Sequence, residues 1–302
     1  MRGYLIIAMS VLLAGLLALH RWVPGFGLRL GSLLETFLPW LGLAVPVLAA
    51  LAWWRRPRLA LPAVLLPLIA WFAVFGGYLV PAGDRSAGLI AVQHNASDEN
   101  LDPSGTARAL MEANPDFIAL EEVTFPAVTD YETTFAAAYP HHSVQGTVAL
   151  WSRYPLTEAA PADIRPASFG PDWNRGLRAV AQTPHGPVAV YVAHLPSIRI
   201  GVSGLESAAR DESAIKLGAL LKAEPLPRVI VLGDLNSTVQ DRGLAPVLDH
   251  VTTSRDFAFS WPARFPVARI DQILARGLTV TDLHTLPRTG SDHLPIAARM
   301  LS

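Results

Sequence analysis

The sequence predicts three membrane-spanning helices followed by an α+β domain with mixed sheets. Residues 3–19, 36–54 and 59–83 are uncharged over the length that a bilayer requires. From residue 89 onward, short apolar runs alternate with turn residues and a few helical stretches, a pattern typical of buried strands packed against helices. A chain of 302 residues is long enough to hold both parts.

The three apolar segments match the thickness of a bilayer. A hydrocarbon core about 30 Å thick takes roughly 17 to 25 helical residues. The first segment could instead be the apolar part of a secretory signal, but no A-x-A-like cleavage site follows it, which favours a retained anchor. We therefore expect an anchor over residues 1–83, with spans near 3–19, 36–54 and 59–80, and a second domain over residues 84–302.

The turn between the second and third segments is strongly basic, with Arg55, Arg56 and Arg58. Short basic turns stay on the cytoplasmic side of a membrane. Arg21 and Arg29 would then lie outside, which opposes this orientation without reversing it. Because the number of spans is odd, the sequence predicts a multi-pass cell-membrane protein whose second domain is extracytoplasmic.

Charge is distributed unevenly along the chain. Six of the 24 basic and one of the 25 acidic residues precede residue 84, so the second domain carries a formal net charge of −6. An acidic domain repels a phosphate backbone, which argues against a general nucleic-acid binder. Cysteine is absent, which excludes disulfides, thiolate catalysis and cysteine-ligated zinc.

The expected elements of the second domain are short. The expected strands are residues 89–93, 117–120, 147–151 and 229–232, with a hairpin formed by 178–182 and 188–192. Helical spacing occurs at residues 106–113 and 207–222. Ser104 could cap the first of these helices. We expect His141, His142 and His185 to be solvated loop residues.

Polar residues gather where these strands end and near the C-terminus. In chain order they are Asn95, Glu121, Glu122, His194, Asp234, Asn236, Asp271, Asp292 and His293. The carboxylates and carboxamides of this set are hard oxygen ligands, which suit Mg²⁺ or Mn²⁺. Zinc is disfavoured because the histidines lack a close His-x-x-x-His spacing. A site of this composition suits phosphate-ester hydrolysis, which needs a Lewis acid, a deprotonated water and donors for developing charge.

Six motifs, in this order, resemble those of the endonuclease/exonuclease/phosphatase superfamily. They are Asn95, Leu120-Glu121-Glu122-Val123, Ala193-His194-Leu195, Gly233-Asp234-Leu235-Asn236, Arg269-Ile270-Asp271 and Ser291-Asp292-His293. The resemblance covers residues 88–302 and implies a DNase I-like layered β-sandwich flanked by helices. The three apolar segments and the aromatic loop at residues 259–266 further resemble the VanJ-like teicoplanin-resistance proteins, which are extracytoplasmic phosphatases for undecaprenyl pyrophosphate.

The resemblance implies ligands for a divalent cation. Glu122 would bind Mg²⁺ or Mn²⁺ with help from Asn95, and Asp292 would lie beside the metal. The family commonly has Gln at the position of Glu121. That side chain could point away on the other face of the strand, so we leave it outside the expected site.

The resemblance also implies the remaining roles. Asp234 and Asn236 would hold and orient the attacking water or the second side of the phosphate group. His293, held by Asp271, would contact the phosphoryl group or relay a proton. His194 would donate to a phosphate oxygen or to the leaving group.

Two arginines, Arg175 and Arg178, lie where relatives place a phosphate-binding arginine. Arg269 would either pair with a carboxylate or touch phosphate. The aromatic residues of the 257–265 loop would form rim and core packing or, alternatively, a groove for a prenyl chain.

The leading functional hypothesis is a membrane-anchored, Mg²⁺-dependent phosphohydrolase. Its substrate would be a lipid-linked phosphate, a polyprenyl pyrophosphate on the outer leaflet, with a link to glycopeptide resistance. Anchoring confines enzyme and lipid to one surface, which raises their effective concentration. A phosphodiesterase for phospholipid or sphingomyelin-type headgroups is the enzymatic alternative, and a nuclease is disfavoured by the acidic charge. A degenerate binding domain is disfavoured because no motif position is lost.

Overall fold

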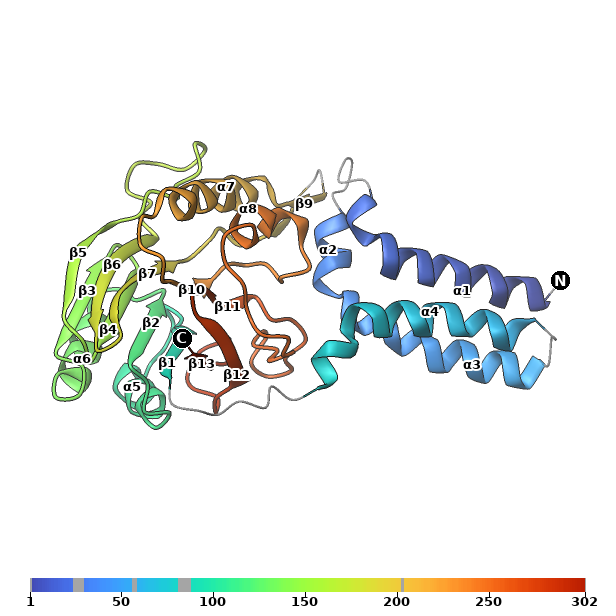
Figure 1. Ribbon diagram of the computed structural model, residues 1–302, viewed down its shortest axis with the longest axis horizontal. Helices are drawn as coiled ribbons and strands as arrows, with labels where there is room; N and C mark the ends of the chain where they lie inside the picture. The colour runs from blue at the N-terminus through green and yellow to red at the C-terminus, as the bar shows by residue number, and fades with distance from the viewer. Residues whose placement is uncertain (1, 24–29, 56–58, 81–87, 202–203, 302) are drawn as a thin grey trace. The chain divides into compact units, whose positions relative to one another are not determined.

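The computed structural model describes residues 2–23, 30–55, 59–80, 88–201 and 204–301 (Figure 1). The chain divides into two units. The first comprises Met1–Pro81, Ile200–Leu205 and Gln240–Arg242, and the second comprises Ala82–Arg199, Glu206–Val239 and Gly243–Ser302. The expected domain boundary after residue 83 falls outside the described residues.

Three apolar helices dominate the first unit, which confirms this part of the predicted fold. The elements are α1 (Arg2–Leu19), η1 (His20–Trp22), α2 (Leu30–Thr36), η2 (Leu38–Leu43), α3 (Ala44–Arg55), α4 (Ala60–Phe75) and η3 (Gly76–Leu79). The segments Gly3–Trp22, Leu38–Arg55 and Ala60–Leu79 are long and apolar enough to cross a membrane. Only 22–28% of each segment is buried within the protein, so most of its apolar surface is left uncovered. Arg56 and Arg58 of the basic turn lie outside the described residues.

The second unit contains two mixed sheets. The first sheet has the order β12-β13-β1-β2-β4-β3. Its strands are β1 (Leu89–Asn95), β2 (Phe117–Glu121), β3 (His141–Gln145), β4 (Val148–Ser152), β12 (Thr279–Thr285) and β13 (Ile296–Leu301). Strands β1 and β2 are parallel, whereas β13 runs antiparallel to β1.

The second sheet has the order β11-β10-β7-β6-β5. Its strands are β5 (Leu156–Pro161), β6 (Gly176–Thr183), β7 (Gly186–Ala193), β10 (Val229–Asp234) and β11 (Asp271–Arg276). Strands β7 and β10 are parallel, and β11 is antiparallel to β10. Two short strands, β8 (Arg199–Gly201) and β9 (Gly204–Glu206), pair with each other.

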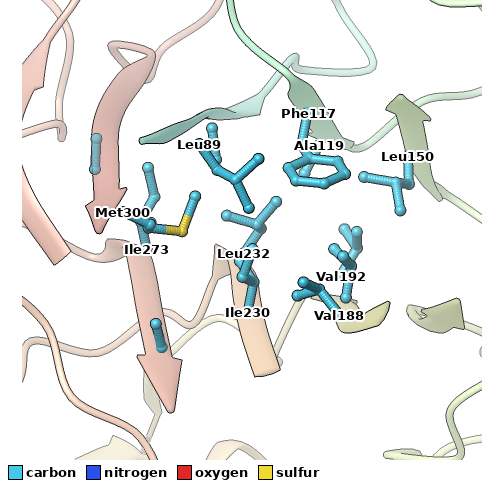
Figure 2. Close-up of a cluster of buried hydrophobic side chains, with 14 of the residues drawn as sticks. Leu89, Phe117, Ala119, Leu150, Val188, Val192, Ile230, Leu232, Ile273 and Met300 are labelled. Atoms are coloured by element: carbon cyan, nitrogen blue, oxygen red, sulfur yellow. The ribbon is translucent and has the colours of Figure 1, made fainter. Parts of the chain in front are cut away.

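The two sheets pack face to face around the main hydrophobic core. Figure 2 shows Leu89, Phe117 and Leu150 of the first sheet directed toward Val192 and Leu232 of the second. Alternate residues of each strand enter this core because side chains point to opposite faces of a strand with a period of two. The expected layered sandwich is therefore present.

Helices cover the outer face of each sheet (Figure 1). They are α5 (Pro103–Met111) and α6 (Ala127–Phe135) on the first sheet, and α7 (Ala208–Ala223), η4 (Arg242–Leu244) and α8 (Ala245–Leu248) near the second. Leu110 and Phe135 join a core with β2 and β4, and Leu217 and Leu221 join one with β7 and β10. The resulting order of layers in the second unit is helix, sheet, sheet, helix.

Two local expectations were wrong. Asp102, and not Ser104, caps α5, because its side chain accepts a hydrogen bond from the Gly105 N–H (2.8 Å). Pro103 then takes the first helical position, where no N–H partner is needed. His141 and His142 belong to edge strand β3 and not to a loop, although His142 is exposed, as expected, and stacks on Trp151. His185, by contrast, is exposed in the turn between β6 and β7, as expected.

Candidate active site

Strand directions bring the sequence motifs to one end of the sandwich. Parallel strands β1 and β2 end side by side, with Asn95 opposite Glu121. In the second sheet β10 ends at Asp234, and antiparallel β11 begins opposite it at Asp271. Residues 291–295 directly precede β13, which pairs with the end of β1, so His293 lies at the same end. Segments far apart in the sequence therefore form one cluster.

A buried pair of side chains, Asp271 and His293, lies at the centre of this cluster. His293 Nδ1 is 2.8 Å from Asp271 Oδ2, and the two residues are 5% and 0% exposed respectively. The loop of His293 is held by Ser291, whose hydroxyl donates to the Asn95 carbonyl (2.7 Å) and accepts from the His293 N–H (3.0 Å). The imidazole is thus oriented by its neighbours before any ligand arrives.

Asp234 connects the two sheets. Its carboxylate accepts hydrogen bonds from Asn95 Nδ2 (3.1 Å) and from the Asn236 N–H (2.9 Å). Asn236 has a left-handed backbone (φ 46°), and its side chain donates to the Leu195 carbonyl (2.9 Å). A Cβ atom at Gly233 would lie 1.9 Å from the Ala193 carbonyl oxygen, so this turn requires glycine. The motif Gly233–Asn236 thereby fixes the position of the carboxylate.

His194 lies beside two carboxylates and one cation. Its Nε2 atom is 3.8 Å from Glu122 Oε1 and 3.7 Å from Asp234 Oδ2. Arg175 Nη1 is 3.2 Å from Nδ1 of the same ring, and its guanidinium lies over the ring of Trp173. Unlike buried His194, Glu122 and Arg175 are part-exposed, so they form the solvent side of the cluster.

Glu121 belongs to the cluster, and the expectation that it points away was wrong. Gln93 Nε2 donates to Glu121 Oε2 (2.6 Å) and to Asp271 Oδ1 (3.0 Å). Strand β2 ends at Glu121, and Glu122 adopts a left-handed backbone (φ 56°), so the usual alternation of faces stops between them. Both glutamates can therefore serve one site.

Gln93 was missed by the sequence reasoning. The available signal was its spacing, because Gln93 and Asn95 are two residues apart on β1 and so share one face of the strand. Gln93 is fully buried and its amide bridges two carboxyl groups, which connects Glu121 to Asp271.

Burial and mutual charge set the protonation states of the central pair. Burial would lower the pKa of His293, but the charges of Asp271 and Asp234 outweigh it and raise that pKa to about 10. Burial would raise the pKa of Asp271, yet His293 holds it below its usual range. Near neutral pH the pair is therefore an imidazolium and a carboxylate.

The pKa values of the neighbouring carboxyl groups are raised and that of the neighbouring histidine is lowered, the reverse of the shifts in the central pair. Burial raises the pKa of Asp234 to about 7, with Asp271 adding to the effect and His293 opposing it. Burial, Asp271 and Asp234 raise the pKa of Glu121 well above its usual range. Burial and the charge of Arg175 lower the pKa of His194 to about 3, so this imidazole is neutral and forms no ion pair with Glu122 near neutral pH.

The donor set fits a hard divalent cation. Asp234, Asp271 and His293 each have a ligand atom within 4.8 Å of the others. His293 is protonated and bonded to Asp271, whereas the carboxylates of Asp234 and Glu122 lie 3.7 and 3.8 Å from Nε2 of neutral His194, and Asn95 donates to Asp234. Oxygen atoms that suit a hard cation are therefore present beside this imidazole. Burial is the main cause of the raised pKa of Asp234, and a bound cation would favour the charged form of this carboxylate.

Three expected residues lie apart from the buried cluster. The Asp292 side chain is exposed, although its backbone carbonyl accepts from the Ala263 N–H (2.7 Å). Arg178 forms a two-bond ion pair with Glu224 (2.9 and 3.0 Å), because it lies on β6 two residues past the end that meets the site. Arg269 donates to the Asp256 carbonyl (2.6 Å) and is buried, which is a structural contact.

The sequence profile of the Endonuclease/Exonuclease/phosphatase family matches residues 74–293. The chain belongs to this family. The three enzyme classes in the family's name all cleave phosphate ester bonds, so the buried acid and base groups lie in a phosphoesterase fold. A sequence comparison with curated proteins gave no match.

Solved structures share the fold at low sequence identity. Sphingomyelinase C from Streptomyces griseocarneus is 19% identical with a TM-score of 0.55, covering 72% of this chain and 100% of its own. A beta toxin variant from Staphylococcus aureus, solved with bound magnesium ions, is 17% identical with a TM-score of 0.53 over 70% and 99%. Truncated TDP2 from Caenorhabditis elegans is 18% identical with a TM-score of 0.56 over 71% and 97%. These similarities establish the two-sheet fold of the family.

Proposed function

We propose that this family member is a membrane-bound, Mg²⁺-dependent phosphohydrolase that removes phosphate from a polyprenyl pyrophosphate, namely undecaprenyl pyrophosphate. The main support is the buried His293–Asp271 pair beside Asp234, on a chain that also carries three membrane-length apolar helices. The pair provides acid-base chemistry for phosphate, and the helices hold it where lipid-linked substrates lie.

Glu122 and Asn95 would hold the cation, with Asp234 next to it. When bound, the cation would act as a Lewis acid on the phosphoryl oxygens. Glu122 is the part-exposed member of the group, so it faces the direction from which the ion and the substrate arrive. The buried members cannot move without breaking the hydrogen bonds between the sheets.

Asp234 would orient the attacking water and accept its proton. Its pKa of about 7 is matched to this task near neutral pH. The water oxygen would bond to the terminal phosphorus as the bridging P–O bond breaks, which gives polyprenyl phosphate and inorganic phosphate. The Asn236 N–H and Asn95 amide keep the carboxylate pointed at the site.

His293 would donate from Nε2 to the phosphoryl oxygen that gains charge. This atom is 3.8 Å from Asp234 Oδ2, so the donor and the proposed base border the same space. Arg175 is the remaining cation beside His194 and would bind a second phosphate oxygen. Neutral His194 would donate a hydrogen bond to the substrate.

The same site would also serve phosphodiester cleavage, and the shared fold with sphingomyelinase C favours this as the second candidate. One assay separates the candidates: purified full-length protein in detergent with Mg²⁺, offered undecaprenyl pyrophosphate, sphingomyelin or duplex DNA. We expect phosphate release from the pyrophosphate. Headgroup release from sphingomyelin instead would establish the phosphodiesterase, and cleavage of DNA would establish a nuclease.

The site is proposed to face away from the cytoplasm, on the strength of the Arg55–Arg58 turn. Alkaline phosphatase fused to the C-terminus should be active, because it folds only outside the cytoplasm. A fluorescent GFP fusion at that end would place the site inside.

A further inference from the structure

Most of the large, strongly exposed apolar side chains of the second unit lie in loops that adjoin the strands of the site. Among its described residues, four such side chains are more than half exposed: Leu101 (99%), Phe125 (84%), Phe265 (72%) and Ile215 (59%). Ile215 lies on α7, over the outer face of the second sheet. The other three lie in loops next to the strands that carry the site, and we refer to Leu101, Phe125 and Phe265 as the apolar rim.

Leu101 and Phe125 lie in neighbouring loops. Leu101 follows β1, which delivers Asn95, and Phe125 follows β2, which delivers Glu122. Because β1 and β2 are parallel and paired, both loops leave from the same edge of the sheet. The Ala96 N–H donates to the Glu121 carbonyl (2.9 Å), which joins the two loops at their start.

The loop of His293 connects Phe265 to the loops that carry Leu101 and Phe125. The Ala263 N–H donates to the Asp292 carbonyl (2.7 Å), and the Leu294 N–H donates to the Ser260 carbonyl (2.8 Å). On its other side, the His293 loop meets the Leu101 loop, since a Cβ atom at Gly290 would lie 2.3 Å from Asn100 Oδ1. The apolar rim therefore borders the catalytic pair along consecutive loops.

Local hydrogen bonds hold the Leu101 loop in shape. The Asn100 side chain accepts from the Asp102 N–H (3.0 Å) and donates to Thr106 Oγ1 (2.8 Å), while its own N–H donates to the Ser97 carbonyl (3.2 Å). Leu101 is thus presented to solvent by an ordered turn, at a position where a polar side chain would be equally compatible with the fold.

The Phe125 loop is held in the same way. The Val123 N–H donates to the Thr147 carbonyl (3.0 Å), and the Val128 N–H donates to the Thr124 carbonyl (3.1 Å). Bonds on both sides of Phe125 leave its ring outside the core. Exposed apolar residues that gather on adjoining loops, in contrast to residues scattered singly, mark a surface that binds something apolar.

We propose that the apolar rim docks the catalytic site on the lipid bilayer itself. This inference rests on the proposed membrane-bound function. The bilayer is the apolar partner that the chain itself points to, because three apolar helices of 18 to 20 residues are long enough to anchor the protein in it. Phe and Leu are side chains that enter the boundary between headgroups and acyl chains. Docked in this way, the rim would bring lipid phosphates to His293 and to the side chains that would hold a cation.

The charge around Leu101 selects the kind of bilayer. Asp98, Glu99 and Asp102 are exposed in the same turn, so the rim carries negative charge beside its apolar residues. Such a surface is repelled by nucleic acid and by strongly anionic membranes. The favoured partner is therefore a bilayer whose bulk lipid is zwitterionic.

The 302 residues include no cysteine, so an introduced cysteine can be labelled at a single position. Single-cysteine variants Leu101→Cys and Phe125→Cys carry an environment-sensitive fluorophore, and Ile215→Cys on α7 is the matched exposed control. Full-length protein is placed in phosphatidylcholine nanodiscs with or without nitroxide-labelled lipid. We expect quenching at positions 101 and 125 and little at 215. Absence of quenching at 101 and 125, or equal quenching at all three positions, would overturn the proposal.

A second arm separates docking from catalysis. The double variant Leu101→Ser/Phe125→Ser should lose on the order of tenfold in activity on a bilayer-borne pyrophosphate, because apolar insertion is lost. Its hydrolysis of a soluble ester, bis(p-nitrophenyl) phosphate, should be unchanged. Equal loss on both substrates would contradict docking. If the wild type hydrolyses neither substrate, the proposed function fails, while the quenching experiment still decides the docking proposal.

Discussion

His293 Nδ1 lies 2.8 Å from Asp271 Oδ2, and both side chains are buried where the two sheets of the sandwich meet. The contact joins the segment before β13 to the first residue of β11. Asp271 also accepts from Gln93 Nε2 (3.0 Å), so the carboxylate that orients the imidazole is itself held in place. Two residues arranged in this way should act as one unit.

That coupling predicts the result of a double-mutant cycle. His293→Ala should lower turnover on the order of 10²-fold, the scale for a positioned acid-base group. Asp271→Asn should cost most of the same amount, and the double variant should be little worse than His293→Ala, because residues that act together are not additive. The exposed pair His284 and Asp282 is the matched control, and His284→Ala should leave turnover unchanged. If the loss in the double variant equalled the product of the two single losses, Asp271 would act independently of His293.

The same pair predicts how stability depends on pH. The pKa of His293 rises from 6.5 to about 10 on folding, so its contribution to stability is fully present below pH 6.5. That contribution decreases as pH rises from 6.5 toward 10, because the unfolded chain loses the proton first. Thermal unfolding, followed by tryptophan fluorescence in detergent, should show wild type losing stability relative to His293→Gln across this range. A constant difference between the two proteins would mean that the imidazole is not charged.

Turnover should require a hard divalent cation. Chelation with EDTA should abolish it, and added Mg²⁺ or Mn²⁺ should restore it. Glu122→Gln removes the charge of a proposed ligand and should raise the Mg²⁺ concentration for half-maximal activity by at least about tenfold. Glu132→Gln, at a carboxylate that pairs with His142 at the surface, is the matched control. An unchanged Mg²⁺ requirement in Glu122→Gln would remove this residue from the site.

Glu121 offers a test of protonation. Burial and the charges of Asp271 and Asp234 raise its pKa well above the usual range, which favours the protonated, neutral side chain. Glu121→Gln has nearly the same shape and neutrality, so turnover should stay within about threefold of wild type. Glu121→Ala removes the acceptor for Gln93 and should cost both stability and turnover. A large loss in Glu121→Gln would show that a charged carboxylate is needed.

The elements that the sequence predicted are those with a strong local pattern. The apolar runs at β1, β2, β4 and β10 and the hairpin β6–β7 are nearly continuous in buried residues, so each was found to within two residues at its ends. Strand β5 is mostly exposed and β3 is a polar edge strand, and neither has the apolar pattern on which the prediction depended.

The order of the motifs predicted which residues form the site, but it did not predict how they are arranged. Asn95, Asp234, Asp271 and His293 converge because of the strand directions, which residue spacing alone does not reveal. The place of Glu121 in the site was not predicted, because the alternation of strand faces ends where Glu122 adopts a left-handed backbone. That feature depends on the folded backbone. Arg178 and Arg175 are separated by only three residues, and only the pairing of β6 shows that they serve different partners.

The central claim is that this site hydrolyses a lipid pyrophosphate, and release of inorganic phosphate from undecaprenyl pyrophosphate tests it most directly. The measurement uses full-length protein in detergent with Mg²⁺, and His293→Ala purified in parallel. We expect continuous phosphate release by the wild type, abolished by EDTA and lowered on the order of 10²-fold in His293→Ala. Absence of release by folded wild-type protein, or equal release by both proteins, would contradict the account.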